Sequence, residues 1–172
     1  MQYRNRMVFA ASLAGTVAFP LAAVGILVTG TGSADRLVDA AAIVSLTSFV
    51  VWVLARVGVQ PLIRCEEGVL TVHNPFLTYR APLSEVRFLA RGGEVGLRIE
   101  GVGAVRPWAL SKSVFDGKRA RAARKELREL VAGAREAAPG PGAAHRRLRY
   151  GLTDLLLLPP LAFAVWNVVD MF

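Results

Sequence analysis

The sequence predicts an α+β membrane protein. An antiparallel β-sandwich or partly open barrel, closed by one C-terminal amphipathic helix, is inserted between transmembrane α-helices, two before it and one after it. Three observations predict this class. Hydrophobic residues make up 53% of the 172 residues and gather in three long apolar blocks. Between the second and third blocks, short runs alternate apolar and polar residues, which is typical of half-buried strands. A stretch with a helical period follows those runs.

The three apolar blocks have the length of transmembrane helices. Residues 7–29 carry no charge, and at about 1.5 Å per residue they cover about 34 Å, more than the roughly 30 Å of a hydrocarbon core. Residues 38–59 form a second block of similar length, and residues 152–169 form a third, interrupted by Pro159 and Pro160. We therefore predict three membrane spans.

Basic residues near the ends of the blocks predict the orientation. Arg4 and Arg6 precede the first block, whereas the loop 30–37 carries only Arg36. Most of the 21 basic residues lie between the second and third blocks. Because cytoplasmic flanks accumulate Lys and Arg, we expect a multi-pass protein of the plasma membrane, with a cytoplasmic central domain and an external C-terminus. Arg outnumbers Lys, and Ala, Gly and Val are abundant, which indicates a GC-rich bacterial genome.

A rival interpretation treats the first block as a cleaved signal peptide, with small residues at Gly32, Ser33 and Ala34. The apolar core of a signal peptide is about 7–15 residues long, and this block is longer. An uncleaved pair of helices is therefore favoured.

The central domain, residues 60–137, contains six short runs with strand character. Turn residues separate them, among them Gly68 and the pair Asn74 and Pro75. Strands at a spacing of about 8–12 residues favour an antiparallel sandwich or small barrel. The predicted strands are 62–65, 69–73, 76–82, 86–90, 95–100 and 105–110.

One amphipathic helix is predicted after the strands. Asp116 is a suitable N-cap, and Pro139 with the glycines around it ends the helical pattern. Residues 138–150 are then a Pro/Gly linker and a basic juxtamembrane segment that leads to the third block. The apolar face consists of Ala120, Ala123, Leu127, Leu130, Val131 and Ala134.

Residues 60–137 resemble the bacterial PH-like (pleckstrin-homology-like) domains of actinobacterial membrane proteins. The resemblance rests on Gly68, an alternating strand, Asn74-Pro75, a second strand, and then Pro82-Leu83-Ser84-Glu85-Val86. Leu83 stands where that family often has Trp. The resemblance implies a PH fold in which the C-terminal helix plugs an open barrel. The activities of such proteins are mostly undetermined, so it implies a fold more than a function.

Residue types that carry catalysis are sparse. The two histidines, His73 and His145, have no Cys or acidic cluster near them at the spacing of metal ligands. Cys65 stands alone in a predicted strand, where it is expected to be a small core residue. No phosphate-binding loop, dinucleotide fingerprint or nucleophile elbow is present. We therefore expect neither an enzyme nor a cofactor or metal.

The leading hypothesis is a non-enzymatic, membrane-anchored binding or scaffolding module held at the cytoplasmic face. Its expected partner is the lipid bilayer, with an anionic phospholipid as ligand, since each Lys or Arg near an anionic leaflet adds about 1 kcal/mol of attraction. The candidate headgroup-binding residues are Arg146, Arg147, Arg149, Lys118, Arg119, Arg121, Arg124, Lys125 and Arg128.

The alternative is an accessory or assembly subunit of a larger membrane protein complex, whose PH-like domain contacts protein instead of lipid. An alanine at every fourth position of the first block, from Ala10 to Ala22, offers a helix-packing face for that role. Nucleic acid is not an expected partner, because no recognition motif accompanies the net charge of +8. Asp39, Asp154 and Asp170 fall at block ends and are expected at the membrane interface.

Overall fold

The computed structural model describes residues 1–30, 35–91, 94–110, 117–136 and 143–171. The chain forms two compact units. Met1–Phe9 and Gln60–Arg149 make a β-unit, and Ala10–Val59 with Tyr150–Phe172 make a helical unit. The described residues contain antiparallel sheets and four α-helices, so the predicted α+β class is confirmed at that level.

Three helices are long and apolar enough to cross a membrane. They are Arg6–Thr29, Arg36–Val59 and Leu152–Val169. Their bounds agree within two residues with the three predicted blocks. At about 1.5 Å per residue they measure about 36, 36 and 27 Å, close to the roughly 30 Å of hydrocarbon.

Local capping explains where these helices begin. Helix α1 (Arg6–Thr29) is capped by Asn5, whose Oδ1 accepts a hydrogen bond from Val8 N at 3.1 Å. Helix α2 (Arg36–Leu54) is capped by Asp35, and it continues into a π-helical turn, η1 (Ala55–Val59).

The third span has two parts. A 3-10 segment, η4 (Leu152–Leu157), precedes the helix α4 (Leu158–Val169). Pro159 and Pro160 lie in the first turn of α4, where a missing N–H costs nothing because those donors have no partner in any helix. The prolines therefore start α4 and do not interrupt it.

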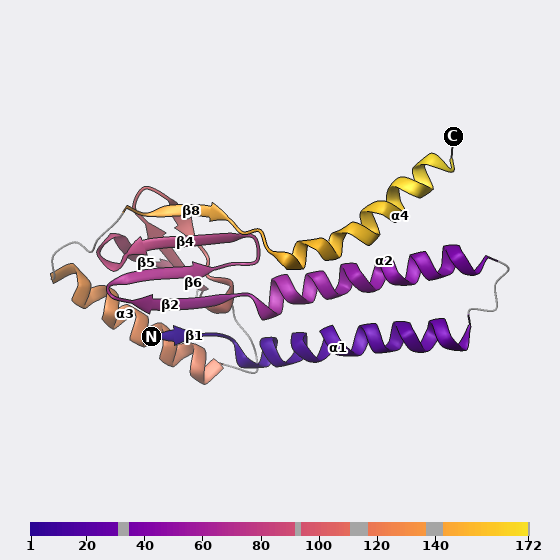
Figure 1. Cartoon of the computed structure of the whole chain (residues 1–172). Helices are drawn as coiled ribbons and strands as arrows, with labels where there is room; N and C mark the ends of the chain where they lie inside the picture. Colours follow the sequence, from indigo (N-terminus) through magenta and orange to yellow (C-terminus); the bar gives the residue numbers. More distant parts are fainter. Residues whose placement is uncertain (31–34, 92–93, 111–116, 137–142, 172) are drawn as a thin grey trace. The chain divides into compact units, whose positions relative to one another are not determined.

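The larger sheet has five antiparallel strands in the order β1-β2-β3-β4-β8 (Figure 1). These are β1 (Gln2–Tyr3), β2 (Leu62–Glu66), β3 (Val69–His73), β4 (Leu77–Pro82) and β8 (His145–Leu148). The three predicted strands in this region are confirmed as β2, β3 and β4.

The smaller sheet has the order β5-β6-β7, also antiparallel. Its strands are β5 (Val86–Arg91), β6 (Glu94–Ile99) and β7 (Gly103–Val105). The run predicted as a strand over 105–110 contributes only Val105. Pro107 lacks an N–H for a strand ladder, and a 3-10 turn, η3 (Trp108–Leu110), follows it.

Strand β8 was not predicted. It lies inside the segment 138–150, which was expected to be a linker, and it follows the helix that was expected to end the domain. The reason is visible in its sequence, His-Arg-Arg-Leu, which has no alternation of apolar side chains. The strand forms through backbone pairing with β4, with Leu77 opposite Leu148 and Arg80 opposite His145.

Helix α3 (Gly117–Glu136) matches the predicted amphipathic helix. Ala120, Ala123, Leu127 and Val131 are buried, whereas Leu130, assigned to the same face from its spacing, is 37% exposed. The predicted N-cap Asp116 and the terminating Pro139 lie outside the described residues.

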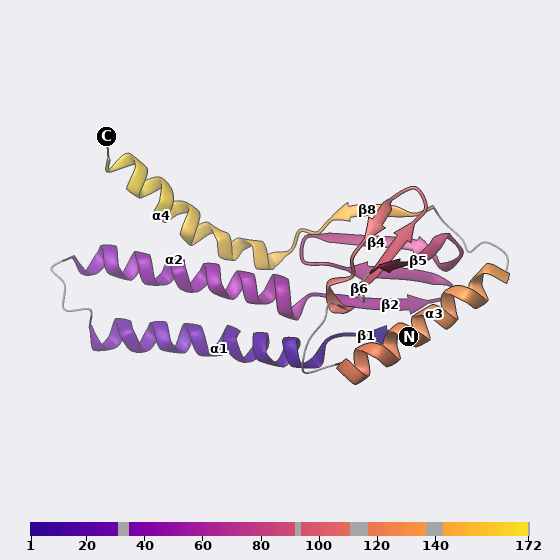
Figure 2. The same cartoon turned by 180° about the vertical axis from the view of Figure 1, so that it is seen from behind.

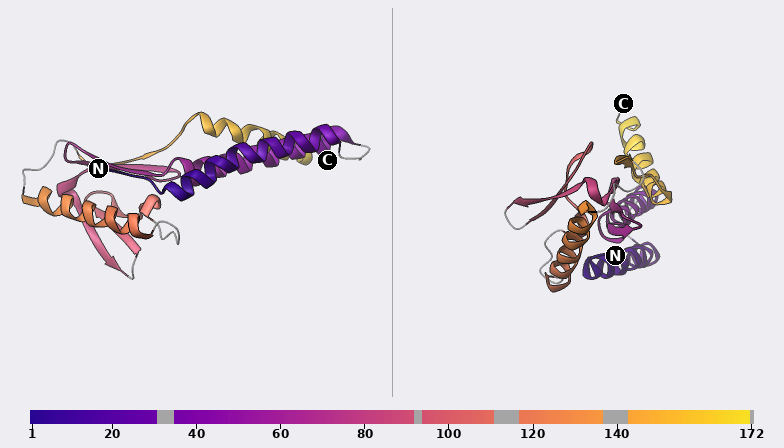
Figure 3. Two further views of the ribbon diagram at one scale, coloured as in Figure 1. Left: turned by 90° about the horizontal axis from the view of Figure 1, so that it is seen from below. Right: turned by 90° about the vertical axis from the view of Figure 1, so that its left-hand side faces the viewer.

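The core of the β-unit lies between the large sheet on one side and the small sheet with α3 on the other. Figures 2 and 3 show α3 and the strands β5 and β6 on the same side of the large sheet. The fully buried side chains come from both sheets and from α3. Among the described parts of the β-unit, α3 and the small sheet therefore cover one face of the large sheet and leave the other uncovered. The fully buried side chains include Ile63, Leu70, Val72, Val86, Leu97, Ile99 and Leu127.

Candidate functional site

The nine predicted headgroup residues lie on two different elements of the β-unit. Six belong to α3, which packs against β5 and the short turn η2 (Leu83–Glu85). The other three belong to β8 and the residue after it, at an edge of the large sheet. Figure 1 shows α3 and β8 on opposite sides of the β-unit, so the structure does not bring the nine into one patch.

Two arginines of α3 contact residues outside the helix. The Nη2 atom of Arg124 donates to Leu110 O at 2.8 Å, and the guanidinium of Arg128 lies 5.5 Å from the centre of the Phe88 ring. These contacts hold the helix against the rest of the domain as well as carrying charge. Among the described side chains of α3, the exposed basic residues are Lys118, Arg119, Arg121, Lys125 and Arg128.

Arg146 and Arg147 point to opposite faces of the large sheet, because successive residues of a strand alternate. Arg146 is opposite Tyr79, in the row that faces the core, but it stays exposed because β8 is an edge strand. Arg147 is opposite Thr78, on the face that neither α3 nor the small sheet covers.

Arg149 is tied to the turns at the end of the sheet. Its backbone N–H donates to Phe76 O at 2.9 Å, and its Nη1 donates to Gln60 O at 3.3 Å. The side chain is half-buried. It is therefore less available to a headgroup than the sequence alone suggests.

The uncovered face of the large sheet gathers cations that the sequence analysis did not group. In the register of β2, β3 and β4, Arg64 is opposite Thr71, and Thr71 is opposite Arg80. Arg147 lies diagonally next to Arg80, at a typical separation of about 7–8 Å. We call Arg64, Arg80 and Arg147, with the histidines of the same face, the basic face; all three arginines are exposed.

His73 is a half-buried histidine of the basic face. Its Nδ1 atom lies 3.0 Å from Thr78 Oγ1. The pKa of His73 is lowered, first by burial and then by the charges of Arg149, Arg64 and Arg4. His145, on the same face, is opposite Arg80.

One signal in the sequence pointed to the basic face. In the predicted strand 62–65, Arg64 alternates with Ile63 and Cys65, which places it on the face away from the core. The alignment of that position with Arg80 and Arg147 depends on the pairing of three strands, which periodicity does not contain.

Three chain connections leave the large sheet at one end. The register places Tyr3 opposite Ile63, Leu62 opposite His73, and Leu77 opposite Leu148. The last residue of β1, the first of β2 and the last of β8 therefore share one end of the sheet, which we call the exit end. Each of these residues lies within four residues of a candidate span.

In the helical unit, Asp154 forms hydrogen bonds that the sequence analysis, which placed it at the membrane interface, did not predict. Its carboxylate accepts from Arg56, with Nε at 3.0 Å, and from Trp52 Nε1 at 3.0 Å, while Gly151 N donates to the other oxygen at 3.0 Å. Arg56 is only 3% exposed. A buried charge needs such partners, so the cluster fastens η4 to α2 and does not offer a free reactive group.

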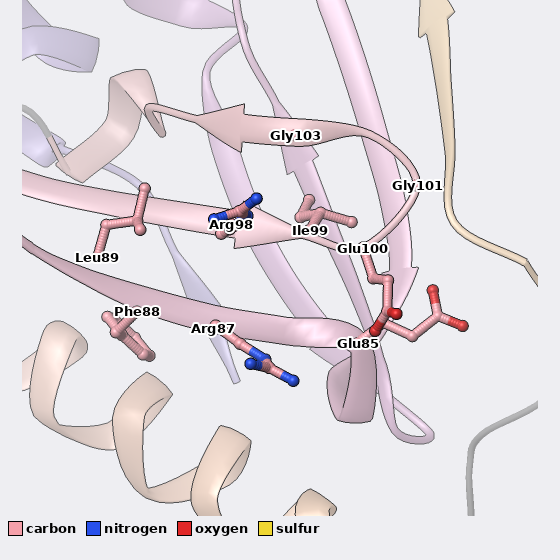
Figure 4. A pocket seen from close by; sticks show the side chains of 9 residues that line it. All are labelled: Glu85, Arg87, Phe88, Leu89, Arg98, Ile99, Glu100, Gly101 and Gly103. Carbon is pink, nitrogen blue, oxygen red and sulfur yellow. The ribbon is translucent and has the colours of Figure 1, made fainter.

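A cavity of about 540 Å³ lies on the small sheet (Figure 4). Arg87 and Arg98 are directly opposite each other in the register of β5 and β6. Glu85 and Glu100 lie at the neighbouring edge of the cavity and balance the two positive charges. The formal charges of the side chains that line the cavity therefore sum to zero.

Cys65 is 6% exposed, and burial raises the pKa of its thiol to about 11. It is a core residue that stays protonated at neutral pH. Within the described part of the chain, no three His, Cys, Asp or Glu side chains come together as a metal site requires.

Comparisons of the chain with protein-family models, curated proteins and solved structures found no match.

Proposed function

We propose that this protein is a non-enzymatic binding or scaffolding module. Its PH-like domain, the β-unit, is held by three membrane spans at the cytoplasmic face of a bacterial plasma membrane. The observation that carries the proposal is the register of the large sheet, because all three connections to the candidate spans leave from the exit end.

Short connections support close tethering. Arg149 precedes Leu152 by three residues, and Leu62 follows Val59 by three. Three extended residues reach at most about 10 Å. If the three helices cross a membrane, the exit end is therefore held within about that distance of the bilayer, with no long linker for the domain to move on.

The positive-inside rule supports the cytoplasmic placement, as the β-unit side of the spans carries most of the basic residues. The test is the accessibility of single cysteines to a membrane-impermeant maleimide in intact cells. The native Cys65 is not expected to react with the maleimide, because its side chain is buried and the pKa of its thiol is raised to about 11. Suitable positions are Leu37 and Met171, 78% and 81% exposed, and the exposed Arg119 on α3.

We expect Leu37→Cys and Met171→Cys to be labelled in intact cells, and Arg119→Cys only after permeabilisation. A membrane-permeant maleimide is the control for reactivity at all three positions. Labelling of Arg119→Cys from outside would reverse the orientation, and labelling of Leu37→Cys and Met171→Cys on opposite sides would rule out three spans.

The alternative, an accessory subunit of a membrane protein complex, has one structural feature in its favour. Among the described strands, β7 pairs with β6 alone, so its outer edge is open to strand addition. A photoreactive amino acid at the exposed Ala104 of β7 tests this. A discrete protein adduct favours the complex, and the absence of any protein adduct favours the leading proposal.

A further inference from the structure

We propose that the basic face docks the domain flat on anionic lipid headgroups. The inference rests on the function proposed above and narrows it to one surface and one class of ligand. Arg64, Arg80 and Arg147 provide the charge, and the neighbouring His73 and His145 complete the surface.

The charge of this face is poorly balanced by the protein itself. Arg64 forms an ion pair with Glu66 on its own strand. No carboxylate occupies a position on this face in the register of β3, β4 or β8. Arg80 and Arg147 are both exposed and are diagonal neighbours, an arrangement that an external anion stabilises, since like charges on adjacent strands repel.

The flat form of the face suits a surface better than a small ligand. Its residues come from four adjacent strands spaced about 4.8 Å apart. The described cavity lies elsewhere, on the small sheet. The row between Arg64 and Arg80 is filled by the short side chain of Thr71, which is half-buried. The guanidinium groups therefore project from a plane.

Chain length favours a lipid surface as the partner. Arg147 precedes the span that begins at Leu152 by five residues, and Arg64 follows the span that ends at Val59 by five. An extended chain of five residues reaches at most about 17 Å. Attraction to an anionic leaflet decays over a Debye length of about 8 Å, and these two arginines are held where rotation of the domain about the exit end brings them into contact.

The test uses the full chain in lipid nanodiscs made of phosphatidylcholine alone or with 30% phosphatidylglycerol. A fluorophore on Thr71→Cys reports contact with the bilayer through quenching by a headgroup-nitroxide lipid, while Cys65 stays unlabelled. We expect quenching in anionic discs that weakens in 0.5 M salt, and little quenching in neutral discs. Equal quenching in both discs would overturn the proposal.

The decisive variant is Arg80→Gln/Arg147→Gln. Each arginine near an anionic surface contributes about a fivefold factor, so the docking equilibrium is expected to fall by about 25-fold. Arg87→Gln/Arg98→Gln removes the same charge from the exposed side of the small sheet and is expected to change it less than threefold. A third pair, Arg119→Gln/Arg121→Gln on α3, is expected to behave like this control; a large loss there with none at β4 and β8 would overturn the assignment to the basic face.

A second measurement of docking needs no fluorophore on the basic face. Burial lowers the pKa of His73, and the charges of Arg149, Arg64 and Arg4 lower it further. Docking on anionic lipid offsets those charges, so the pKa of His73, followed by NMR of ¹³C-labelled histidine, is expected to rise in anionic discs. An unchanged pKa contradicts docking.

Free glycerophosphoglycerol, added to neutral discs, separates a bilayer surface from a soluble anion. If it raises the pKa of His73 as much as the anionic discs do, the face is a site for a soluble phosphodiester and the bilayer proposal is wrong. Nanodiscs present both leaflets to the protein. This experiment therefore succeeds or fails independently of the orientation in cells, which the cysteine labelling decides.

Discussion

The packing of α3 on the two sheets makes a sharp prediction for Leu127→Ala. Leu127 is fully buried, at 0% exposure. The substitution removes three carbon atoms, worth about 2.4 kcal/mol at about 0.8 kcal/mol for each. The cavity it leaves raises the expected loss to about 3–4 kcal/mol. Against a typical total of 5–15 kcal/mol, such a loss is large.

The assay follows unfolding through Cys65. The full chain in detergent micelles is equilibrated at increasing urea concentrations and then pulsed with a maleimide. Cys65 reacts only where the β-unit has opened, because it is buried in the same core cluster as Leu127. With a urea dependence of about 1.5 kcal/mol per molar, a loss of 3 kcal/mol lowers the midpoint by about 2 M.

Leu130→Ala is the matched control on the same helix. Leu130 is 37% exposed, so the same chemical change is expected to cost less than about 1 kcal/mol. Equal midpoints for the two variants, or a loss below about 1 kcal/mol for Leu127→Ala, would refute the burial of α3 against the sheets.

Four further outcomes are expected. Since the pKa of Cys65 is raised from 9.0 to about 11, its thiolate fraction at pH 8 is about 100-fold below that of the unfolded chain, and iodoacetamide labelling should be slower by at least that factor. The raised pKa of Cys65 also makes the free energy of unfolding fall as pH rises from about 9 towards 11, because the thiol ionises first in the unfolded chain. A urea midpoint that stays constant over that pH range would contradict this pH dependence. Arg56→Gln removes the buried partner of Asp154 and should lower the temperature of aggregation in detergent. The decrease should be larger than for Ser45→Ala, which removes one hydrogen bond to α4. Equal decreases would show that the ion pair stabilises the helical unit no more than a single hydrogen bond does. Gly68→Ala places a side chain at φ +73° in the turn between β2 and β3 and should destabilise the β-unit by about 1–2 kcal/mol in the same urea assay. An unchanged urea midpoint would contradict strain at this position.

The amino-acid sequence by itself determined the elements whose signal is local. A helix long and apolar enough to cross a membrane needs apolar residues along most of its length, so the three span-length helices were visible as apolar blocks. Strands β2 to β6 and the buried stripe of α3 were visible because burial of one face leaves a period of two or of 3.6 in the residues.

Tertiary structure alone decided how those elements pair. Strand β8 carries no periodic signal and exists because its backbone completes a ladder with β4. The basic face requires Arg64, Arg80 and Arg147, from three strands separated by up to 83 positions in the chain, to fall into one register. Arg56 and Asp154 meet across 98 positions. Periodicity records which side of an element is buried, whereas the partner across a sheet or between helices is selected by packing and hydrogen bonding of the folded chain, which no local window contains.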